Sequence, residues 1–312
     1  GKMFVGAWSE KQRLAIEDEL KKHPRYDEAK QKGVAFTEVG GDLTATEEEY
    51  MFSATAFSGK TWGVLSYPYA VSERAFSTLL NVMRLEYYAT IVDGLPLTAQ
   101  EQKDVALHVN DATGRGGTGP NSEVITRLIW SPRLLISRWN LLRLRGVIGG
   151  GTSKTTKKLI MKQYAKAMRS VGVLLLLAAG SRWGDDWEEW LNFIDPRSSK
   201  FATIKIGNTY VDPWGGMKQL AVFIARIAPG LPFIPGSPTK RNWEGELVPL
   251  DEGVYGQNVW GEISRFTLTK LNPALGVGIS YAQKSDMMGR PMTEGRAMYE
   301  LIAPLAPQEG LV

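Results

Sequence analysis

Apolar residues recur every three to four positions in several stretches of the chain, which is the spacing of one helical face. The clearest stretch is residues 71–93, and its apolar positions with this spacing are Ala75, Leu79, Val82, Leu85 and Tyr88. Ser72 precedes them as a candidate N-cap, and Gly94 follows as a candidate stop. The pattern predicts a helix over this stretch.

The same spacing, with start and stop signals, predicts further helices at residues 9–32, 98–109, 122–145 in two pieces, 156–180, 216–228 and 264–271, and a short one from 293. Thr98 and Glu101 have the separation of a capping box, as do Ser9 and Gln12, so each pair is expected to begin a helix. Ser131 is expected to cap the helix that begins at the proline after it.

Residues 202–212 show the alternation of apolar and polar residues that indicates a β-strand. Ile204 and Ile206 alternate with polar neighbours, and the Gly-Asn pair that follows is a strong turn signal. Residues 229–262 are rich in proline and glycine and predict a long coil. The sequence thus predicts a mainly α fold with a small β-hairpin near 202–212, an irregular multi-helix domain wrapped by long Pro/Gly-rich loops.

Two regions are expected. Residues 1–70 predict a helix and loops that link to a preceding part of a longer chain, and residues 71–312 predict the helical domain. The chain has no cysteine, which excludes disulfides, thiolate metal sites and cysteine nucleophiles. His23 and His108 are the only histidines, so a multi-histidine metal site or a histidine-based triad is barely feasible.

Positive charge is concentrated in one block. The formal net charge is only +4, yet residues 127–169 contain no Asp or Glu. The basic residues of this block are Arg127, Arg133, Arg138, Arg143, Arg145, Lys154, Lys157, Lys158, Lys162, Lys166 and Arg169. The block also holds many leucines and isoleucines, with Trp130 and Trp139. A segment that is both cationic and apolar is predicted to contact nucleic acid or a membrane.

The apolar run Val171–Ala179 continues this block toward the end of the predicted 156–180 helix. The run is shorter than the roughly twenty residues that span a bilayer. A longer span would bury Lys162, Lys166 and Arg169 at a cost of about 2.5 kcal/mol or more each. Two interpretations stay open: a helix in the protein core, and a segment that enters a membrane after release.

Acidic residues follow at once, namely Asp185, Asp186, Glu188 and Glu189. They are expected to pair with the preceding cationic block. Trp183, Trp187 and Trp190 are spaced by four and three and are predicted to share one helical face, either in the core or as an interfacial aromatic contact.

Other candidate features point to structure rather than chemistry. The glycine-rich stretches lack the spacing of phosphate-binding loops and are interpreted as hinges, with Gly114, Gly116, Gly117, Gly149, Gly150 and Gly151 as the hinge residues. The cluster Glu47–Glu49 could bind a metal but fits the polar start of a helix better. His108 lies near the end of its predicted helix, where the dipole favours a proton, and is expected to be structural. No catalytic residue, cofactor or metal ligand is assigned.

Four motifs resemble one family. DPRSSKFATIKIGNTYVDPWGG resembles the DPRSS…KI(R/K)xGNTRxDxxGG pattern of very large tailed-phage and mobile-element proteins that carry a large polyvalent-protein-associated domain. The other matches are SERAFSTLLNVMR, NDATGRG followed by SPRLLISR, and NPALGVGISYAQKSDMMGRPM, in the family's order across about residues 70–310. Tyr210 departs from the pattern, since arginine is common there. The family has no settled catalytic residues to transfer.

The resemblance implies a non-enzymatic segment of an internal virion (ejection) protein, released with the genome to help DNA delivery across the host envelope. It implies the virion interior, and then the host envelope or periplasm, as location. Implied partners are portal, tail or other ejection proteins, phage DNA, the host membrane and further copies in an oligomer. An alternative is a nucleic-acid-binding module of a giant polyprotein, such as the non-catalytic part of a virion-packaged polymerase or anti-restriction protein. An enzyme using Asp185, Asp186 or His108 is a third hypothesis.

Overall fold

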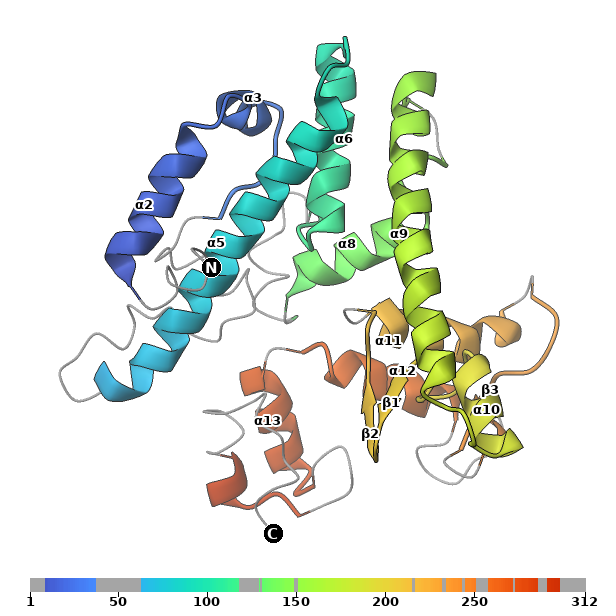
Figure 1. Ribbon diagram of the computed structural model, residues 1–312. Coiled ribbons are helices and arrows are strands. Elements are labelled where there is room, and N and C mark those ends of the chain that lie inside the picture. The colour runs from blue at the N-terminus through green and yellow to red at the C-terminus, as the bar shows by residue number, and fades with distance from the viewer. Residues whose placement is uncertain are drawn as a thin grey trace. The chain divides into compact units, whose positions relative to one another are not determined.

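The computed structural model describes residues 9–37, 63–117, 129, 131–148, 151–214, 217–231, 234–242, 245–250, 258–271, 273–285 and 291–297 (Figure 1). The α-helices are α2 (Glu10–Lys21), α3 (Tyr26–Gln31), α5 (Gly63–Val92), α6 (Ala99–Ala112), α8 (Pro132–Leu142), α9 (Lys154–Gly180), α10 (Trp187–Ile194), α11 (Met217–Ile227), α12 (Val259–Leu268) and α13 (Pro273–Ala282). A short 3-10 helix, η2 (Ala228–Gly230), follows α11.

Two small antiparallel hairpins accompany the helices. Strand β1 (Ile204–Ile206) pairs with β2 (Thr209–Val211), with Ile204 opposite Val211. Strand β3 (Thr239–Arg241) pairs with β4 (Leu247–Pro249), with Arg241 opposite Leu247. The prediction of a mainly α fold with a small β-hairpin near 202–212 is confirmed.

The chain divides into two compact units. Unit 1 comprises residues 1–161 and 270–312, and unit 2 comprises residues 162–269. This division differs from the predicted boundary at residue 70, which falls inside α5. Helix α5 begins at Gly63, so Ser72 lies inside the helix and not at its start. The helices before residue 70 pack against α5, which is why they belong to the same unit.

The core of unit 1 forms where α3, α5 and α6 meet. Its buried residues are Ala29, Val34, Leu85, Tyr88, Ile91, Val92, Val105, Ala106 and Val109. Leu159, in the second turn of α9, packs against this cluster. Each fully buried Val, Leu or Ile side chain contributes about 1.5–3 kcal/mol, so this cluster is a main source of stability in unit 1.

Of the helix N-caps predicted at Ser9, Thr98 and Ser131, one makes the expected side-chain hydrogen bonds. The capping box of α6 is confirmed, because the Glu101 backbone N–H donates to Thr98 Oγ1 (3.3 Å) and the Thr98 N–H donates to Glu101 Oε2 (2.9 Å). The prediction that the Ser9 and Ser131 side chains cap their helices was wrong, since neither side chain makes a capping hydrogen bond. Ser131 adopts φ 50°, which turns the chain into α8 by backbone geometry instead.

The core of unit 2 lies where the end of α9 meets α10 and the β1–β2 hairpin. Ala178, Phe193 and Ala202 are buried, and the partly buried residues around them are Leu175, Ala179, Trp190, Phe201, Ile204 and Trp214. Helix α9 therefore contributes its first turns to the core of unit 1 and its last turns to the core of unit 2.

The β3–β4 hairpin lies in the stretch predicted as coil, so that prediction was wrong in part. Its strands are only three residues long and carry no apolar–polar alternation over a useful length. Asn242 closes the loop, because its side-chain oxygen accepts from the Glu246 backbone N–H at 2.8 Å. The hairpin depends on such contacts between residues several positions apart, and these were not visible as a pattern.

Candidate contact surface

Helix α9 carries six of the eleven basic residues of the predicted block. Ser153 caps it, since the Thr156 backbone N–H donates to Ser153 Oγ at 3.1 Å. The same hydroxyl donates to Glu101 Oε1 at 2.6 Å, which joins the starts of α6 and α9. Thr156 and Ile160 are buried near the start of α9, and Ala178 is buried near its end. Both ends of the helix therefore pack against other parts of the protein.

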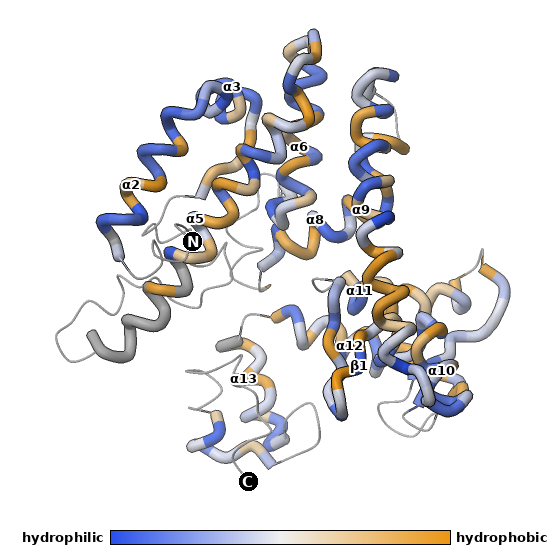
Figure 2. The backbone as a smooth tube through the Cα atoms, in the orientation of Figure 1, coloured by the Kyte–Doolittle hydropathy of each residue, from blue (hydrophilic) through white to orange (hydrophobic). Residues whose placement is uncertain are grey.

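The exposed face of α9 within unit 2 has two halves. We call it the α9 stripe, and it consists of Lys162, Lys166, Arg169, Val173, Leu176 and Leu177. These positions keep a spacing of three and four, so they lie along one side of the helix. The apolar members are far from buried, with exposed fractions of 53% for Val173, 74% for Leu176 and 62% for Leu177. Figure 2 shows the corresponding change along α9 from mainly hydrophilic to mainly hydrophobic residues.

The remaining members of the basic block differ in how exposed their side chains are. Arg143, Lys154 and Lys158 are exposed, and Trp139 is exposed on α8. Arg145 is engaged with Asp111 at 3.3 Å. The other described members, which are partly buried, are Arg133, Arg138 and Lys157. Four predicted site residues, Arg127, Trp130, Gly149 and Gly150, lie outside the described residues, as does the Glu47–Glu49 cluster.

The acidic residues after α9 do not pair with the basic block among the described residues. Asp185 pairs with Lys205 (Oδ1–Nζ, 2.6 Å) and with Arg182 (Oδ2–Nη1, 3.5 Å). Glu189 pairs with Lys200 (Oε1–Nζ, 2.6 Å) and also with Arg182 (Oε2–Nη1, 3.5 Å). The predicted pairing was wrong because α9 is rigid. Arg169 and Gly180 are eleven positions apart, which is about 16 Å along the helix, so the cations of the α9 stripe lie away from Asp185 and Glu189.

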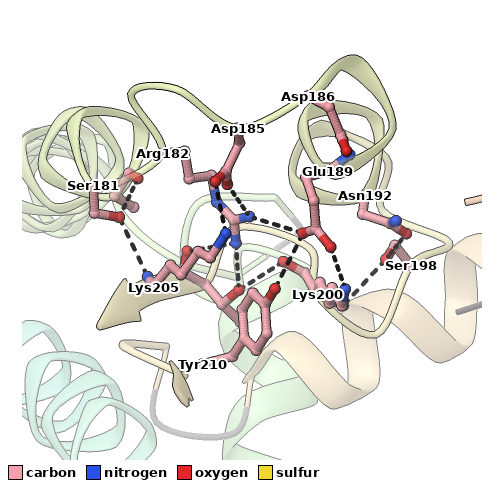
Figure 3. A network of polar contacts seen from close by, with 12 residues as sticks. Ser181, Arg182, Asp185, Asp186, Glu189, Asn192, Ser198, Lys200, Lys205 and Tyr210 are labelled. Atoms are coloured by element: carbon pink, nitrogen blue, oxygen red, sulfur yellow. Dashed lines mark hydrogen bonds and ion pairs between the residues drawn. The ribbon is translucent and has the colours of Figure 1, made fainter. Parts of the chain in front are cut away.

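Arg182 is the centre of this network, which Figure 3 shows between the end of α9, α10 and the β1–β2 hairpin. Its side chain is fully buried and donates to the Thr203 carbonyl (3.2 Å) and hydroxyl (3.0 Å). Its guanidinium lies 4.8 Å from the centre of the Phe193 ring and 5.4 Å from that of Tyr210. Arg182 was not predicted as a site residue, although an arginine three positions after the apolar run Val171–Ala179 is a visible signal in the sequence.

Tyr210 belongs to the same network. Its hydroxyl donates to Glu189 Oε2 at 3.1 Å, and Lys200 Nζ lies 5.0 Å from its ring centre. Burial raises the pKa of Glu189, but Lys200 and Tyr210 outweigh it, so the net shift is downward. Tyr210 thus stabilises the cluster as a hydrogen-bond donor and as a ring for two cations.

The tryptophans were predicted to share one helical face, which was wrong for Trp183. Helix α10 begins at Trp187, and Gly184, with φ +97°, ends the preceding turn. Asp186 caps α10, since it accepts from the Glu189 backbone N–H at 2.9 Å. Trp183 and Trp187 have exposed fractions of 92% and 70%, whereas Trp190 is partly buried and packs edge-on against Phe193.

The DPRSS motif forms a turn in which Asp195 and Ser198 are buried. Asp195 accepts from Arg197 Nε (2.9 Å) and Nη2 (2.9 Å), and from Arg241 Nη2 (2.6 Å) on β3. Burial would raise the pKa of Asp195, but the hydrogen bonds and charges of the two arginines lower it to about 2. Ser198 Oγ donates to Asn192 Oδ1 at 2.9 Å. These contacts fix the end of α10 to the β3–β4 hairpin, which is a structural role.

The NDATGRG motif has a similar role in unit 1. Asn110 donates to the Gly33 carbonyl (2.8 Å) and accepts from the Ala35 N–H (2.9 Å). Thr113 Oγ1 accepts from Arg84 Nε at 3.1 Å, and Arg84 is itself almost fully buried. The motif therefore holds two parts of the chain against the end of α6, namely helix α5 and the segment that follows α3.

The predicted hinge glycines fall into two groups. A Cβ at Gly114 would lie 2.9 Å from Leu134, and a Cβ at Gly116 would lie 2.6 Å from the Ser137 backbone N. These two glycines make the contacts of a packed turn against α8. A Cβ at Gly117 or Gly151 would meet nothing within 4 Å, so the hinge prediction stays open at these positions.

His108 is buried in α6, which continues to Ala112, so the predicted protonation near a helix end was wrong. Burial lowers its pKa to about 4, which leaves the ring neutral at pH 7. Tyr87 Oη lies 3.1 Å from its Nε2. Asp111 is also buried; burial raises its pKa, although Asn140 and Arg145 oppose that shift.

Within the described ranges no helix is long and apolar enough to cross a membrane. Nor do three of the His, Asp and Glu side chains described there group as a metal site. The chain matches no family model, and comparisons with curated proteins and with solved structures likewise find no match.

Proposed function

We propose that this chain is a non-enzymatic segment of a large phage internal virion (ejection) protein. In this proposal it is packaged inside the particle with other virion proteins. It is then released with the genome to help deliver DNA across the host envelope. The observation that supports it best is the α9 stripe, a continuous exposed surface that is cationic in one half and apolar in the other.

The charges of the stripe are available to an outside partner. No carboxylate of the described residues pairs with Lys162, Lys166 or Arg169. The neighbouring acidic residues Asp185 and Glu189 are already occupied by cations of unit 2. An anionic partner would therefore meet positive charge that no carboxylate of the described residues neutralises.

The apolar half of the stripe favours a bilayer surface over other anionic partners. A bilayer containing anionic lipids offers negative charge at its surface and apolar chains beneath it. Each cation near such a surface contributes about 1 kcal/mol, so Lys162, Lys166 and Arg169 together contribute about 3 kcal/mol. This corresponds to roughly a 100-fold gain in affinity.

A nucleic-acid-binding module is the second candidate. The observation in its favour is the set of exposed basic and aromatic side chains outside unit 2, namely Arg143, Lys154, Lys158 and Trp139. Phosphates attract such cations, and bases stack on an exposed indole. This candidate predicts DNA binding that weakens steeply with salt and does not need Leu176 or Leu177.

Sedimentation of the full chain with vesicles of anionic or neutral lipids, beside salt-titrated DNA binding, tests both candidates. We expect binding to anionic vesicles and at least about 100-fold weaker binding for the triple variant Lys162→Glu, Lys166→Glu, Arg169→Glu, because the change removes three cations and adds three anions. Leu176→Ser with Leu177→Ser should weaken vesicle binding at least about tenfold.

The matched control carries the same charge change on α2. Lys11, Lys21 and Lys22 are exposed, and their replacement by Glu should leave most of the vesicle binding in place. If both triple variants lost vesicle binding equally, net charge alone would explain the loss. That result would contradict the proposal that the α9 stripe binds the vesicles. Binding to DNA alone, with no vesicle binding, would favour the second candidate.

A further inference from the structure

Unit 2 contains a cavity of about 450 Å³ between α11 and α12. Its apolar part is formed by Val222, Phe223 and Phe266. The two phenylalanine rings are stacked, with centres 4.2 Å apart and planes inclined by 14°. A cavity of this size with an aromatic wall falls in the range that holds small organic ligands.

Three cations surround this apolar wall. Lys218, which is half-buried, donates to the Ser199 carbonyl at 3.0 Å and has two further N–H groups. Arg226 donates through Nε to the Arg197 carbonyl (2.9 Å) and through Nη1 to Glu262 (3.0 Å). The Arg265 side chain is 52% exposed, and its Nη1 lies 3.8 Å from Glu262 Oε1, which is beyond hydrogen-bond distance.

The carboxylates of the cavity do not balance these cations. Glu262 is almost fully buried and is shared by Arg226, Arg265 and also Lys240, whose Nζ lies 3.5 Å away. Asp212 is the other acidic residue of the lining, and its Oδ1 accepts from the Trp214 backbone N–H. The lining thus has a formal excess of positive charge, and some of its guanidinium and ammonium donors have no acceptor among the described residues.

We propose that this cavity binds a small carboxylate that carries an aromatic group. The carboxylate would lie between Lys218 and Arg265, whose donors suit its two oxygens, and the ring would pack against Phe223 and Phe266. Burial lowers the pKa of Lys218, and Asp212 opposes that shift only in part. A bound anion would replace the hydration that burial removes from this ammonium group.

This proposal does not depend on the function proposed for the α9 stripe, because none of the stripe residues lines the cavity. The probe is phenylacetate, and its neutral isostere phenylacetamide is the matched control. Calorimetric titration of the full chain is expected to give a Kd of about 1 mM for phenylacetate, which is ordinary for a ligand of this size. Phenylacetamide should bind at least about tenfold more weakly.

Two variants locate the site. Lys218→Met and Arg265→Gln remove one charge each, and each should weaken phenylacetate binding about tenfold without affecting vesicle binding. Arg169→Gln, on the α9 stripe, should leave phenylacetate binding unchanged. Three results would overturn the proposal: no binding of phenylacetate, equal affinity for the amide, or unchanged affinity in both cavity variants. If the unmodified chain bound phenylacetate but not vesicles, only the function proposed for the α9 stripe would be contradicted.

Discussion

Asp195 joins three parts of unit 2 through one carboxylate. It lies directly after α10, begins the DPRSS turn, and accepts hydrogen bonds from Arg197 within the turn and from Arg241 on β3. A buried carboxylate with two guanidinium partners is stable only while all three groups are present. Removing it would leave both arginines without their only carboxylate partner among the described residues, although Arg197 still donates to Thr239 and Arg241 to the Gly245 carbonyl.

We expect Asp195→Asn to lower the free energy of unfolding by about 2 kcal/mol at pH 7. The pKa of Asp195 is about 2 in the folded protein, below the value of roughly 3.9 for an unfolded chain. Its contribution is therefore complete above about pH 4 and is lost as the pH falls toward 2. Urea unfolding followed by circular dichroism at pH 7 and pH 2.5 should show the variant's deficit shrinking at the lower pH. A deficit that is the same at both values would contradict the prediction.

At the residue scale, the sequence identified motifs but not their partners. DPRSS and NDATGRG were recognised as motifs, yet the contacts that explain them join Asp195 to Arg241 and Thr113 to Arg84. These pairs are 46 and 29 positions apart. No local periodicity encodes such a pairing, because it depends on how the helices pack. The pairing of Arg182 with Thr203, 21 positions away, was not predicted for the same reason.

Close packing between the NDATGRG turn and α8 is the feature that matters at the scale of elements. The Gly116 backbone N–H donates to the Arg133 carbonyl at 3.0 Å, which brings the turn against the first turn of α8. A Cβ at Gly116 would lie 2.6 Å from the Ser137 N and 2.9 Å from the Arg133 O. Both atoms belong to the backbone of a helix and cannot move aside easily.

Gly116→Ala is expected to destabilise the protein by about 1–3 kcal/mol, because the turn and α8 must separate to admit the methyl group. Gly117→Ala is the matched control, since nothing lies within 4 Å of its added Cβ. It should change stability by no more than about 0.5 kcal/mol. Urea unfolding of both variants measures the difference. Two variants of equal stability would mean that the turn is mobile, as the hinge hypothesis holds.

Elements with local signals were predicted well from the sequence. The capping box of α6 and the β1–β2 hairpin are confirmed, because a cap and a two-residue turn depend on neighbours in the chain. The β3–β4 hairpin was not predicted, since long-range contacts such as the Arg241–Asp195 pair position it. The start of α5 at Gly63 was not predicted either. The same limit applies to the α9 stripe: sequence showed its charges, but only the structure shows which face is exposed.

At the scale of the whole molecule, the division into two units predicts how the stability losses of substitutions in different units add. Gly116 belongs to unit 1 and Asp195 to unit 2, and they have no partner in common. The double variant Gly116→Ala, Asp195→Asn should therefore lose the sum of the two single losses, to within about 0.5 kcal/mol. The check is a double-mutant cycle by urea unfolding at pH 7. A coupling above about 1 kcal/mol would mean that the two positions interact energetically, although they lie in different units.

The exposed indoles of Trp183 and Trp187 make the end of α9 visible to spectroscopy. A tryptophan in water emits at longer wavelengths than one in apolar surroundings, and small quenchers such as acrylamide reach it freely. A partner that covers this part of unit 2 would shift the contribution of these two indoles, among the ten tryptophans of the chain, to the blue and shield it from the quencher. The chain thus carries a native fluorescent reporter beside the surface by which we propose it makes contact.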